Sequence, residues 1–230
     1  MKLSGRILHL VDDPEAVRLQ LEGQDLPFDH EKPYSYGVNT DLMISGRACT
    51  LGYTGTVLGP YFLENFLEVV QQDGVRSGGF QVVVGGHAYG SGSSREVAVV
   101  AHQGAGIELI VAQSFQRIFQ ENMVYSGMPF TTNLGVVARL TAGDEVDLDD
   151  LVVDLPPFFR AVTEAGGLAR FGTKLLDGVV KPTYDTDRTA RPMNIAEKII
   201  AARAWCGPGA ADGMASVNPG DQILCRAAFR

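Results

Sequence analysis

A glycine-rich turn between a predicted strand and a predicted helix is the part of the sequence best suited to chemistry. It lies in 82–103, which reads VVVGGHAYGSGSSREVAVVAHQ. Its glycines permit close backbone approach, and the helix that we expect to begin at about Ser94 directs free N–H groups at the turn. Arg95 adds a donor fork that matches a carboxylate. The turn is therefore suited to holding a small anion.

The same residues also have a simpler interpretation. Ser93 and Glu96 match S-x-x-E, a capping box that only starts a helix, and spacing alone favours this alternative. No lysine follows the glycines as in a P-loop, and Gly92 is followed by Arg95 where a dinucleotide fingerprint has a third glycine. A G-x-S-x-G hydrolase motif is also missing from the sequence. The turn by itself predicts an anion site but identifies no function.

The elements that would position this turn alternate between strands and helices. We predict strands over 6–11, 81–84, 108–112 and 134–140, and helices over 16–22, 61–71, 96–103 and 115–126. This alternation is typical of an α/β fold. The segment 144–154 alternates acidic and apolar residues, as an edge hairpin or exposed strand would, and a helix is expected from Pro157 through Phe171.

Composition limits the class of protein. The chain has 230 residues, 45% of them hydrophobic, enough for one domain plus an appendage. It contains no apolar run of about 20 residues and no basic-headed apolar leader, and its three separated cysteines predict neither a disulfide framework nor a metal site. We therefore expect a cytoplasmic protein. The net charge of -8 argues against nucleic-acid binding and leaves a local anion pocket possible.

The C-terminal part of the chain differs in character. Pro, Thr, Asp and Arg cluster over 181–192, and from Thr186 onward the net charge is +2 against -10 for the remainder. We predict a domain over 1–182, a linker over 183–192 and a tail over 193–230. Within the tail, Asn194 can cap a helix through Trp205, and 217–226 predicts a turn followed by a strand.

Several motifs resemble those of aconitase and isopropylmalate-dehydratase small subunits, and they occur in that family's order. They are Asn39-Thr40-Asp41 with Ile44 and Gly46-Arg47, Tyr89-Gly90-Ser91-Gly92-Ser93-Ser94-Arg95-Glu96, Ala105-Gly106-Ile107, Ser114-Phe115-Gln116-Arg117-Ile118-Phe119 with Asn122, and Gly166-Gly167-Leu168. One chance motif does not explain a set that spans roughly residues 37–176. The resemblance implies an aconitase-type swivelling β/β/α domain, with a mixed sheet flanked by helices, plus a C-terminal appendage.

The resemblance also implies residue roles. Ser93 matches the serine that acts as an alkoxide base, and Arg95 matches the arginine that binds the substrate carboxylate. Ser94, Gly92, Arg47 and Thr50 are the further candidates for substrate binding. Asp41 matches an aspartate that orients a histidine of the partner, with an Asx turn after Thr40 as a nearly equal alternative. For Arg47, contact with the substrate and a surface ion pair are equally favoured interpretations.

Two departures from the family pattern affect the prediction. Val97 stands where the family usually has histidine after Arg-Glu. The loop after Arg47, residues 48–52, is small and mostly apolar, which favours a substrate with an uncharged arm. The four histidines have no metal-ligand spacing; we interpret His102 as a surface or packing residue and His87 as a strand-end side chain.

The function implied is the small component of an iron–sulfur hydro-lyase that isomerises an isopropylmalate-like 2-hydroxy di- or tricarboxylate by dehydration and rehydration. The resemblance implies a four-iron cluster on a large partner subunit or domain, no metal or cofactor in this chain, and no nucleic-acid or membrane partner. The alternative is a non-catalytic small-anion-binding or regulatory module with the same fold.

The tail has a resemblance of its own. Met193–Ala201 and Val217–Asp221 resemble the helix and the V-x-P-G-D turn that open the family's large subunit. We therefore expect the chain to be the first part of a small–large fusion, with a tail that is mobile or docked on a second chain, and a homo-oligomer formed through the tail is one such arrangement. The alternative is a C-terminal helix and hairpin that dock on the swivel domain.

Overall fold

The computed structural model describes residues 5–29, 31–93, 95–152 and 155–227. The chain divides into two compact units between Asp154 and Leu155. The predicted boundaries at 182 and 192 lie inside the second unit and stay predictions. Among the described residues, no helix combines the length and the apolar character that crossing a membrane requires.

The first unit is built on a four-stranded sheet in the order β1 (Arg6–His9), β2 (Phe80–Gly85), β3 (Leu109–Ala112), β4 (Phe130–Thr131). Each of the three strand pairs is parallel. The α/β class is confirmed, but the expected mixed sheet is corrected to a parallel one in the described residues. The reason is that helices return the chain between β2 and β3 and between β3 and β4, so each strand starts again at the same edge.

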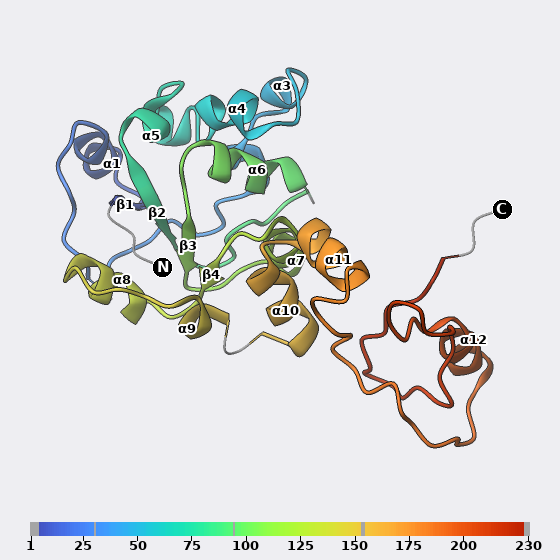
Figure 1. The fold of residues 1–230 in the computed structure, drawn as a ribbon. Helices are drawn as coiled ribbons and strands as arrows, with labels where there is room; N and C mark the ends of the chain where they lie inside the picture. The colour runs from blue at the N-terminus through green and yellow to red at the C-terminus, as the bar shows by residue number, and fades with distance from the viewer. Residues whose placement is uncertain (1–4, 30, 94, 153–154, 228–230) are drawn as a thin grey trace. The chain divides into compact units, whose positions relative to one another are not determined.

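Helices cover this sheet (Figure 1). They are α1 (Pro14–Leu21), α2 (Thr40–Met43), α3 (Gly46–Cys49), α4 (Gly55–Leu58), α5 (Gly74–Ser77), α6 (Glu96–Gly104), α7 (Arg117–Ser126), α8 (Gly135–Thr141) and α9 (Leu148–Val152), with 3-10 helices at Gly59–Tyr61 and Phe66–Glu68. In Figure 1, α4, α5 and α6 lie above the strands and α8 and α9 below them. Val83 and Val84 of β2 are 0% exposed, as in a strand covered on both faces.

Three predicted elements of the first unit are wrong. Residues 61–71 do not form one helix, because Leu63, Asn65, Leu67 and Glu68 have positive φ and interrupt it. The predicted strand over 134–140 is helix α8. The predicted hairpin or strand over 144–154 contains helix α9 instead, with Leu151 and Val152 buried; residues 153 and 154 lie outside the described part of the chain.

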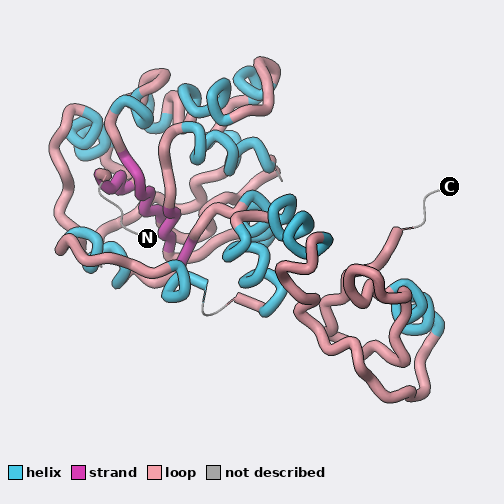
Figure 2. The backbone as a smooth tube through the Cα atoms, viewed as in Figure 1, coloured by secondary structure: helices cyan, strands magenta, loops and turns pink. Residues whose placement is uncertain are grey.

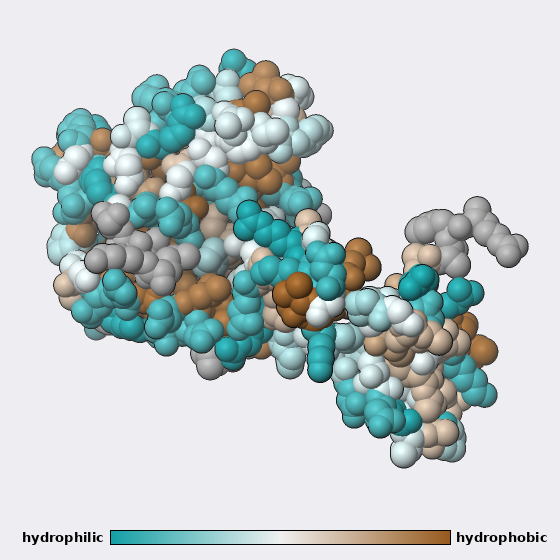
Figure 3. Space-filling view, viewed as in Figure 1, coloured by the Kyte–Doolittle hydropathy of each residue, from teal (hydrophilic) through white to brown (hydrophobic). Residues whose placement is uncertain are grey.

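The second unit contains α10 (Pro157–Ala165), α11 (Leu168–Leu176) and α12 (Ile195–Arg203). Gly166 at φ 83° separates α10 from α11, and the Phe158 and Phe171 rings join them at 5.7 Å between centroids. Figure 2 shows α12 surrounded by loop segments. Apolar surface gathers over α11 in Figure 3, where Leu176 is 69% exposed.

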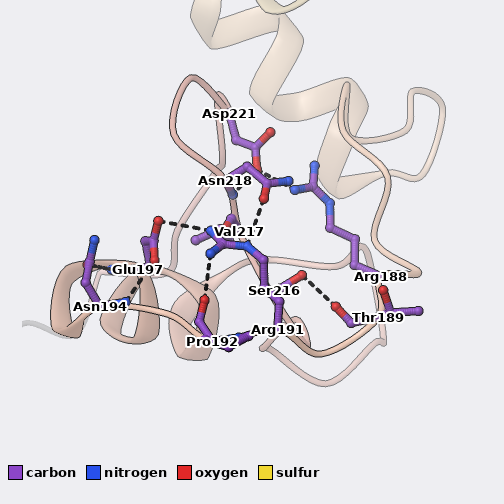
Figure 4. Close-up of polar contacts among 10 residues, drawn as sticks. All are labelled: Arg188, Thr189, Arg191, Pro192, Asn194, Glu197, Ser216, Val217, Asn218 and Asp221. Atoms are coloured by element: carbon purple, nitrogen blue, oxygen red, sulfur yellow. Dashed lines mark hydrogen bonds and ion pairs between the residues drawn. The ribbon is translucent and has the colours of Figure 1, made fainter.

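The predicted cap of the tail helix is confirmed. Asn194 and Glu197 form a reciprocal capping box at the start of α12. The predicted turn is present, with the Asp221 N–H donating to Asn218 O at 3.1 Å. The strand expected after it is wrong: the described residues there show a single bridge, Ala204 to Cys225. Figure 4 shows the polar contacts that hold this region together, centred on Arg191.

Candidate active site

The glycine-rich turn after β2 lies between two other segments of the first unit. On one side Gly90 N–H donates to Val38 O at 2.9 Å, and Thr40 N–H donates to Ser91 O at 2.9 Å. On the other side Tyr89 N–H donates to Ser114 O at 3.0 Å. Since the strands are parallel, the turn and Ser114 both follow the carboxyl ends of strands, where α/β proteins commonly place their ligands. Three of the five motif segments of the sequence are thus brought together.

Glycine is required at one point of this turn. Gly90 has φ 78°, and a Cβ built on it would lie 2.2 Å from Cγ of Phe119 on α7. An L side chain there is strained by its backbone and blocked by the ring. Gly90 therefore lets the turn approach α7 closely enough to share a cavity with it.

A buried tyrosine anchors the same turn to α6. Tyr89 is 0% exposed, and its hydroxyl lies 2.8 Å from Nε2 of His102. Nδ1 of His102 lies 2.7 Å from Ala98 O, and because a carbonyl only accepts, Nδ1 carries the proton and Nε2 accepts from Tyr89. Burial lowers the pKa of His102 to about 4. His102 is therefore a neutral packing residue, one of the two roles predicted for it.

The turn, α2 and α7 enclose a cavity of about 510 Å³. Its lining residues are Thr40, Gly90, Gly92, Ser93, Arg95, Gln116, Arg117, Ile118, Phe119, Glu121 and Asn122. Ser93 and Arg95, the predicted base and the predicted carboxylate ligand, thus face one space. The sequence analysis gives the α7 residues of this wall no role in the site. The motif from Ser114 to Asn122 is the signal that could have indicated one.

Ser93 is exposed and contacts Thr40. The Thr40 hydroxyl lies 2.8 Å from Ser93 O and 3.3 Å from Ser93 Oγ. The helix begins at Glu96 instead of at about Ser94, and its N-cap Arg95 has no side-chain cap hydrogen bond. The capping box of Ser93 and Glu96 is thus not formed among the described residues of this turn. Ser94 lies outside the described residues.

Arg95 is held in place by two acceptors. Its Nη2 lies 2.5 Å from Oδ1 of Asp41, and its Nη1 donates to Ile44 O at 3.0 Å. Two of its five N–H groups are used in these contacts, so others can bind a carboxylate in the cavity. Asp41, predicted to orient a histidine of the partner, has a 61% exposed side chain in its pair with Arg95. Its role toward a partner stays a prediction.

Of the remaining predicted substrate ligands, one lines the cavity and two do not. Gly92 lines the cavity with Ser93, whereas Arg47 and Thr50 are not among its lining residues. Both are exposed, and the Thr50 hydroxyl donates to Arg47 O at 2.8 Å. His87, predicted as a strand-end side chain, is exposed with Nδ1 3.3 Å from Ser114 Oγ.

The chain's donors do not match an iron–sulfur cluster. Such a cluster needs clustered thiolates, and Cys49 lies in the first unit whereas Cys206 and Cys225 lie in the second. No group of three His, Cys, Asp or Glu that could hold a metal ion occurs among the described residues. The cavity next to Ser93 therefore offers a hydroxyl and a guanidinium from this chain, and its described lining residues form no such group of metal ligands.

Comparison with known proteins identifies the family of this chain. The aconitase C-terminal domain model matches residues 68–132, which include Ser93 and Arg95. The 3-isopropylmalate dehydratase small subunit of Pyrobaculum calidifontis is 35% identical over 117 residues, covering 50% of this chain and 69% of that protein. The same subunit of Halothermothrix orenii is 32% identical over 152 residues, covering 59% and 88%.

Two relatives come from Methanocaldococcus jannaschii. Its isopropylmalate/citramalate isomerase small subunit is 36% identical over 101 residues, covering 38% of this chain and 60% of the relative. A crystal structure of 3-isopropylmalate dehydratase from that organism aligns at 27% identity and a TM-score of 0.44, covering 60% and 88%.

Fold and site together define an α/β domain of the aconitase type, with a serine and an arginine at a glycine-rich turn. The chain belongs to the family of 3-isopropylmalate dehydratase small subunits.

Proposed function

We propose that this chain is the small component of an iron–sulfur hydro-lyase. With a large, cluster-bearing subunit or domain, it isomerises an isopropylmalate-like 2-hydroxy di- or tricarboxylate by dehydration and rehydration. The observation that carries this proposal is the placement of Ser93 and Arg95 on one cavity of about 510 Å³. The named small subunits among its relatives support the class of reaction.

Arg95 binds and orients the substrate in this proposal. Its side chain is 29% exposed and retains free N–H groups beyond those that contact Asp41 and Ile44. A guanidinium held by two fixed acceptors presents its other donors in a defined plane, which suits a carboxylate. The carbon next to that carboxylate then lies within reach of Ser93.

Ser93 removes the proton from that carbon. As an alkoxide it accepts the proton, the C–H electron pair forms the double bond, and the neighbouring C–O bond breaks with departure of hydroxide. Addition of hydroxide to the carbon that lost the proton, with return of a proton from Ser93 to the carbon that lost the hydroxyl, completes the isomerisation. No residue of this chain is assigned to the departing hydroxide, because the described residues contain no set of ligands for a cluster.

The partner would meet the exposed side of this cavity. Asp41 has a 61% exposed carboxylate, and a carboxylate can accept from Arg95 and from a further donor at once. A histidine of the large component is the donor that the family resemblance implies. The cytoplasm is the compartment that we propose, in keeping with the biosynthetic relatives.

The test is reconstitution of the chain with its large component and an assembled cluster. The complex is given a panel of malate-type 2-hydroxy acids, and the unsaturated intermediate is followed by its absorbance. We expect turnover, and at least about tenfold faster turnover of alkylmalates than of citrate-like acids, since burying an unpaired carboxylate is costly. A complex that forms with an intact cluster but turns over none of the panel would refute the enzyme proposal and favour a non-catalytic anion-binding module.

A further inference from the structure

Thr40 is the residue in closest polar contact with Ser93 that has no assigned role. We propose that Thr40 is a positioning residue for Ser93: its hydroxyl fixes the serine Oγ and stabilises it when it loses its proton. This inference rests on the proposed function, since it concerns the same serine base.

The backbone around Thr40 is fixed from two directions. Thr40 N–H donates to Ser91 O at 2.9 Å, and Asn39, the N-cap of α2, accepts from Leu42 N–H through its side chain. The residue is 1% exposed and is β-branched, so its side chain has little freedom to rotate. The hydroxyl of Thr40 is therefore held at a defined position beside the turn.

The hydrogen-bond directions at this hydroxyl follow from its partners. Ser93 O lies 2.8 Å away and can only accept, so the Thr40 proton points at it in the resting state. The Ser93 Oγ contact at 3.3 Å then has the serine as donor and Thr40 as acceptor. The serine proton is thereby directed at Thr40, and the lone pairs of Ser93 Oγ are left for other groups.

Ionisation of Ser93 reverses this contact. When the serine proton passes to solvent, the Thr40 hydroxyl rotates and donates to the alkoxide. Ser93 O does not lose its last partner, because Arg95 N–H also donates to it at 2.8 Å. The switch therefore leaves no buried carbonyl without a hydrogen bond, and a hydrogen bond to a charged oxygen is stronger than one to a neutral oxygen.

Other charges lie around the cavity that Ser93 lines. Arg95 of the turn, paired with Asp41, and the Arg117 and Glu121 pair of α7 lie around the cavity. None of these four groups is substituted in the Thr40 variants, so the comparison below changes only the side chain at position 40.

The test compares Thr40→Val with Thr40→Ser in the reconstituted complex. Valine keeps the shape and removes the hydroxyl, whereas serine keeps the hydroxyl. We expect Thr40→Val to lower kcat about 10-fold to 100-fold with KM changed less than about threefold, a range typical of a lost hydrogen bond to a charged group. Thr40→Ser should restore kcat to within about fivefold of wild type.

The pH profile separates this role from a merely structural one. Activity that requires ionised Ser93 rises with pH, and loss of a donor to the alkoxide raises the pKa of the serine. The rising limb of kcat/KM should therefore move up by about one pH unit or more in Thr40→Val, in line with the fall in rate. A matched control is Thr163→Val, because Thr163 is also buried, donates to a backbone carbonyl at 2.9 Å and does not line the cavity.

Each outcome decides the proposal. A folded Thr40→Val complex with wild-type kcat and an unmoved pH limb would overturn it. Equal losses in Thr40→Val and Thr40→Ser would also overturn it, since the hydroxyl would then be irrelevant. If Thr40→Val fails to fold, Thr40→Ala and Thr40→Ser supply the same comparison by circular dichroism and kcat. Failure of the proposed function is distinct, because the wild-type complex would then turn over no substrate.

Discussion

At the scale of single residues, the site depends on buried polar pairs that hold an exposed serine. Tyr89 and His102 lie wholly inside the first unit and join the glycine-rich turn to α6. Burial raises the pKa of Tyr89, so both groups are neutral at physiological pH. Ser93 itself is exposed, which lets a substrate reach it while the residues behind it stay fixed.

The buried histidines predict how stability depends on pH. Burial lowers the pKa of His102 to about 4 and that of His9 to about 4. Between that value and about 6.5 the unfolded chain binds more protons than the folded one, so stability is lost as pH falls. Each histidine should contribute a loss of about 2 kcal/mol between pH 7 and pH 5.

Urea unfolding of wild type and His102→Gln at the two pH values measures this effect. The loss of unfolding free energy on acidification should be smaller by about 2 kcal/mol in His102→Gln. His87→Gln, at an exposed position, is the control and should keep the wild-type loss. If His102→Gln loses as much unfolding free energy on acidification as wild type does, folding does not lower the pKa of His102.

At the scale of elements, the glycine-rich turn works because it packs against α7. Gly90 carries both a positive φ of 78° and a predicted Cβ clash of 2.2 Å with Phe119. Gly143 has a similar φ of 86° but no atom within 4 Å of a built Cβ. A side chain at Gly143 therefore tests backbone strain alone, whereas one at Gly90 tests backbone strain together with overpacking.

Alanine at these two glycines should give different losses of stability. Gly143→Ala should cost about 1 kcal/mol through its backbone, and Gly90→Ala about 3 kcal/mol because the clash adds to it. Thermal or urea unfolding of both variants measures the difference. Similar losses in the two variants would contradict the close approach of the turn to Phe119.

The sequence predicted the elements around the turn well because their patterns are local. The strands at 81–84 and 108–112 and the helix at 96–103 lie within β2, β3 and α6 give or take a residue. Ser93 and Arg95 could be placed together because they share that turn. The sequence did not place the α7 wall or Thr40 beside Ser93, since that placement depends on parallel strands bringing distant segments to one edge.

The elements that were predicted wrongly have physical reasons. The segment 134–140 is rich in valine, which favours strands, but Val136 and Val137 are buried by packing in α8 and tertiary contacts prevail. In 144–154 the acidic alternation concealed a helical spacing, Leu148, Leu151 and Val152. Neighbouring parts of the fold impose positive φ in 61–71 without a local pattern of glycines to indicate it.

At the scale of the whole molecule, the two units differ in what stabilises them. The first has the sheet and its buried apolar core, whereas residues 184–226 combine a few buried apolar side chains, such as Trp205 and Val217, with many polar contacts. Arg191 donates to Pro192 O at 2.7 Å, to Asn218 Oδ1 at 2.9 Å and to Glu197 Oε1 at 3.0 Å, and also contacts Val217 O. Much of the predicted linker is thus tied to the tail (Figure 4).

Arg191→Met should loosen the tail without unfolding the first unit. The loss of several hydrogen bonds to one guanidinium is expected to raise hydrogen exchange around α12 by at least about tenfold. Exchange in β2 and β3 should stay as in wild type. Arg226→Met is the control, since its ion pair with Asp212 involves a 61% exposed side chain and should matter little. Equal hydrogen exchange around α12 in the two variants would show that the contacts of Arg191 do not stabilise the tail.

The proposed function depends on removal of the substrate proton by Ser93. The most direct measurement is deuterium uptake from D₂O into the substrate by the reconstituted complex, followed by mass spectrometry. Wild type should exchange the carbon-bound proton, because the proton that Ser93 takes up can exchange with solvent before a proton is returned to the substrate. Ser93→Ala should exchange it at least about 1000-fold more slowly while folding normally, because residue 93 is exposed and caps no helix. Ser91→Ala, a neighbouring serine outside the cavity lining, should exchange within about threefold of wild type. Near-normal exchange in Ser93→Ala would contradict the account.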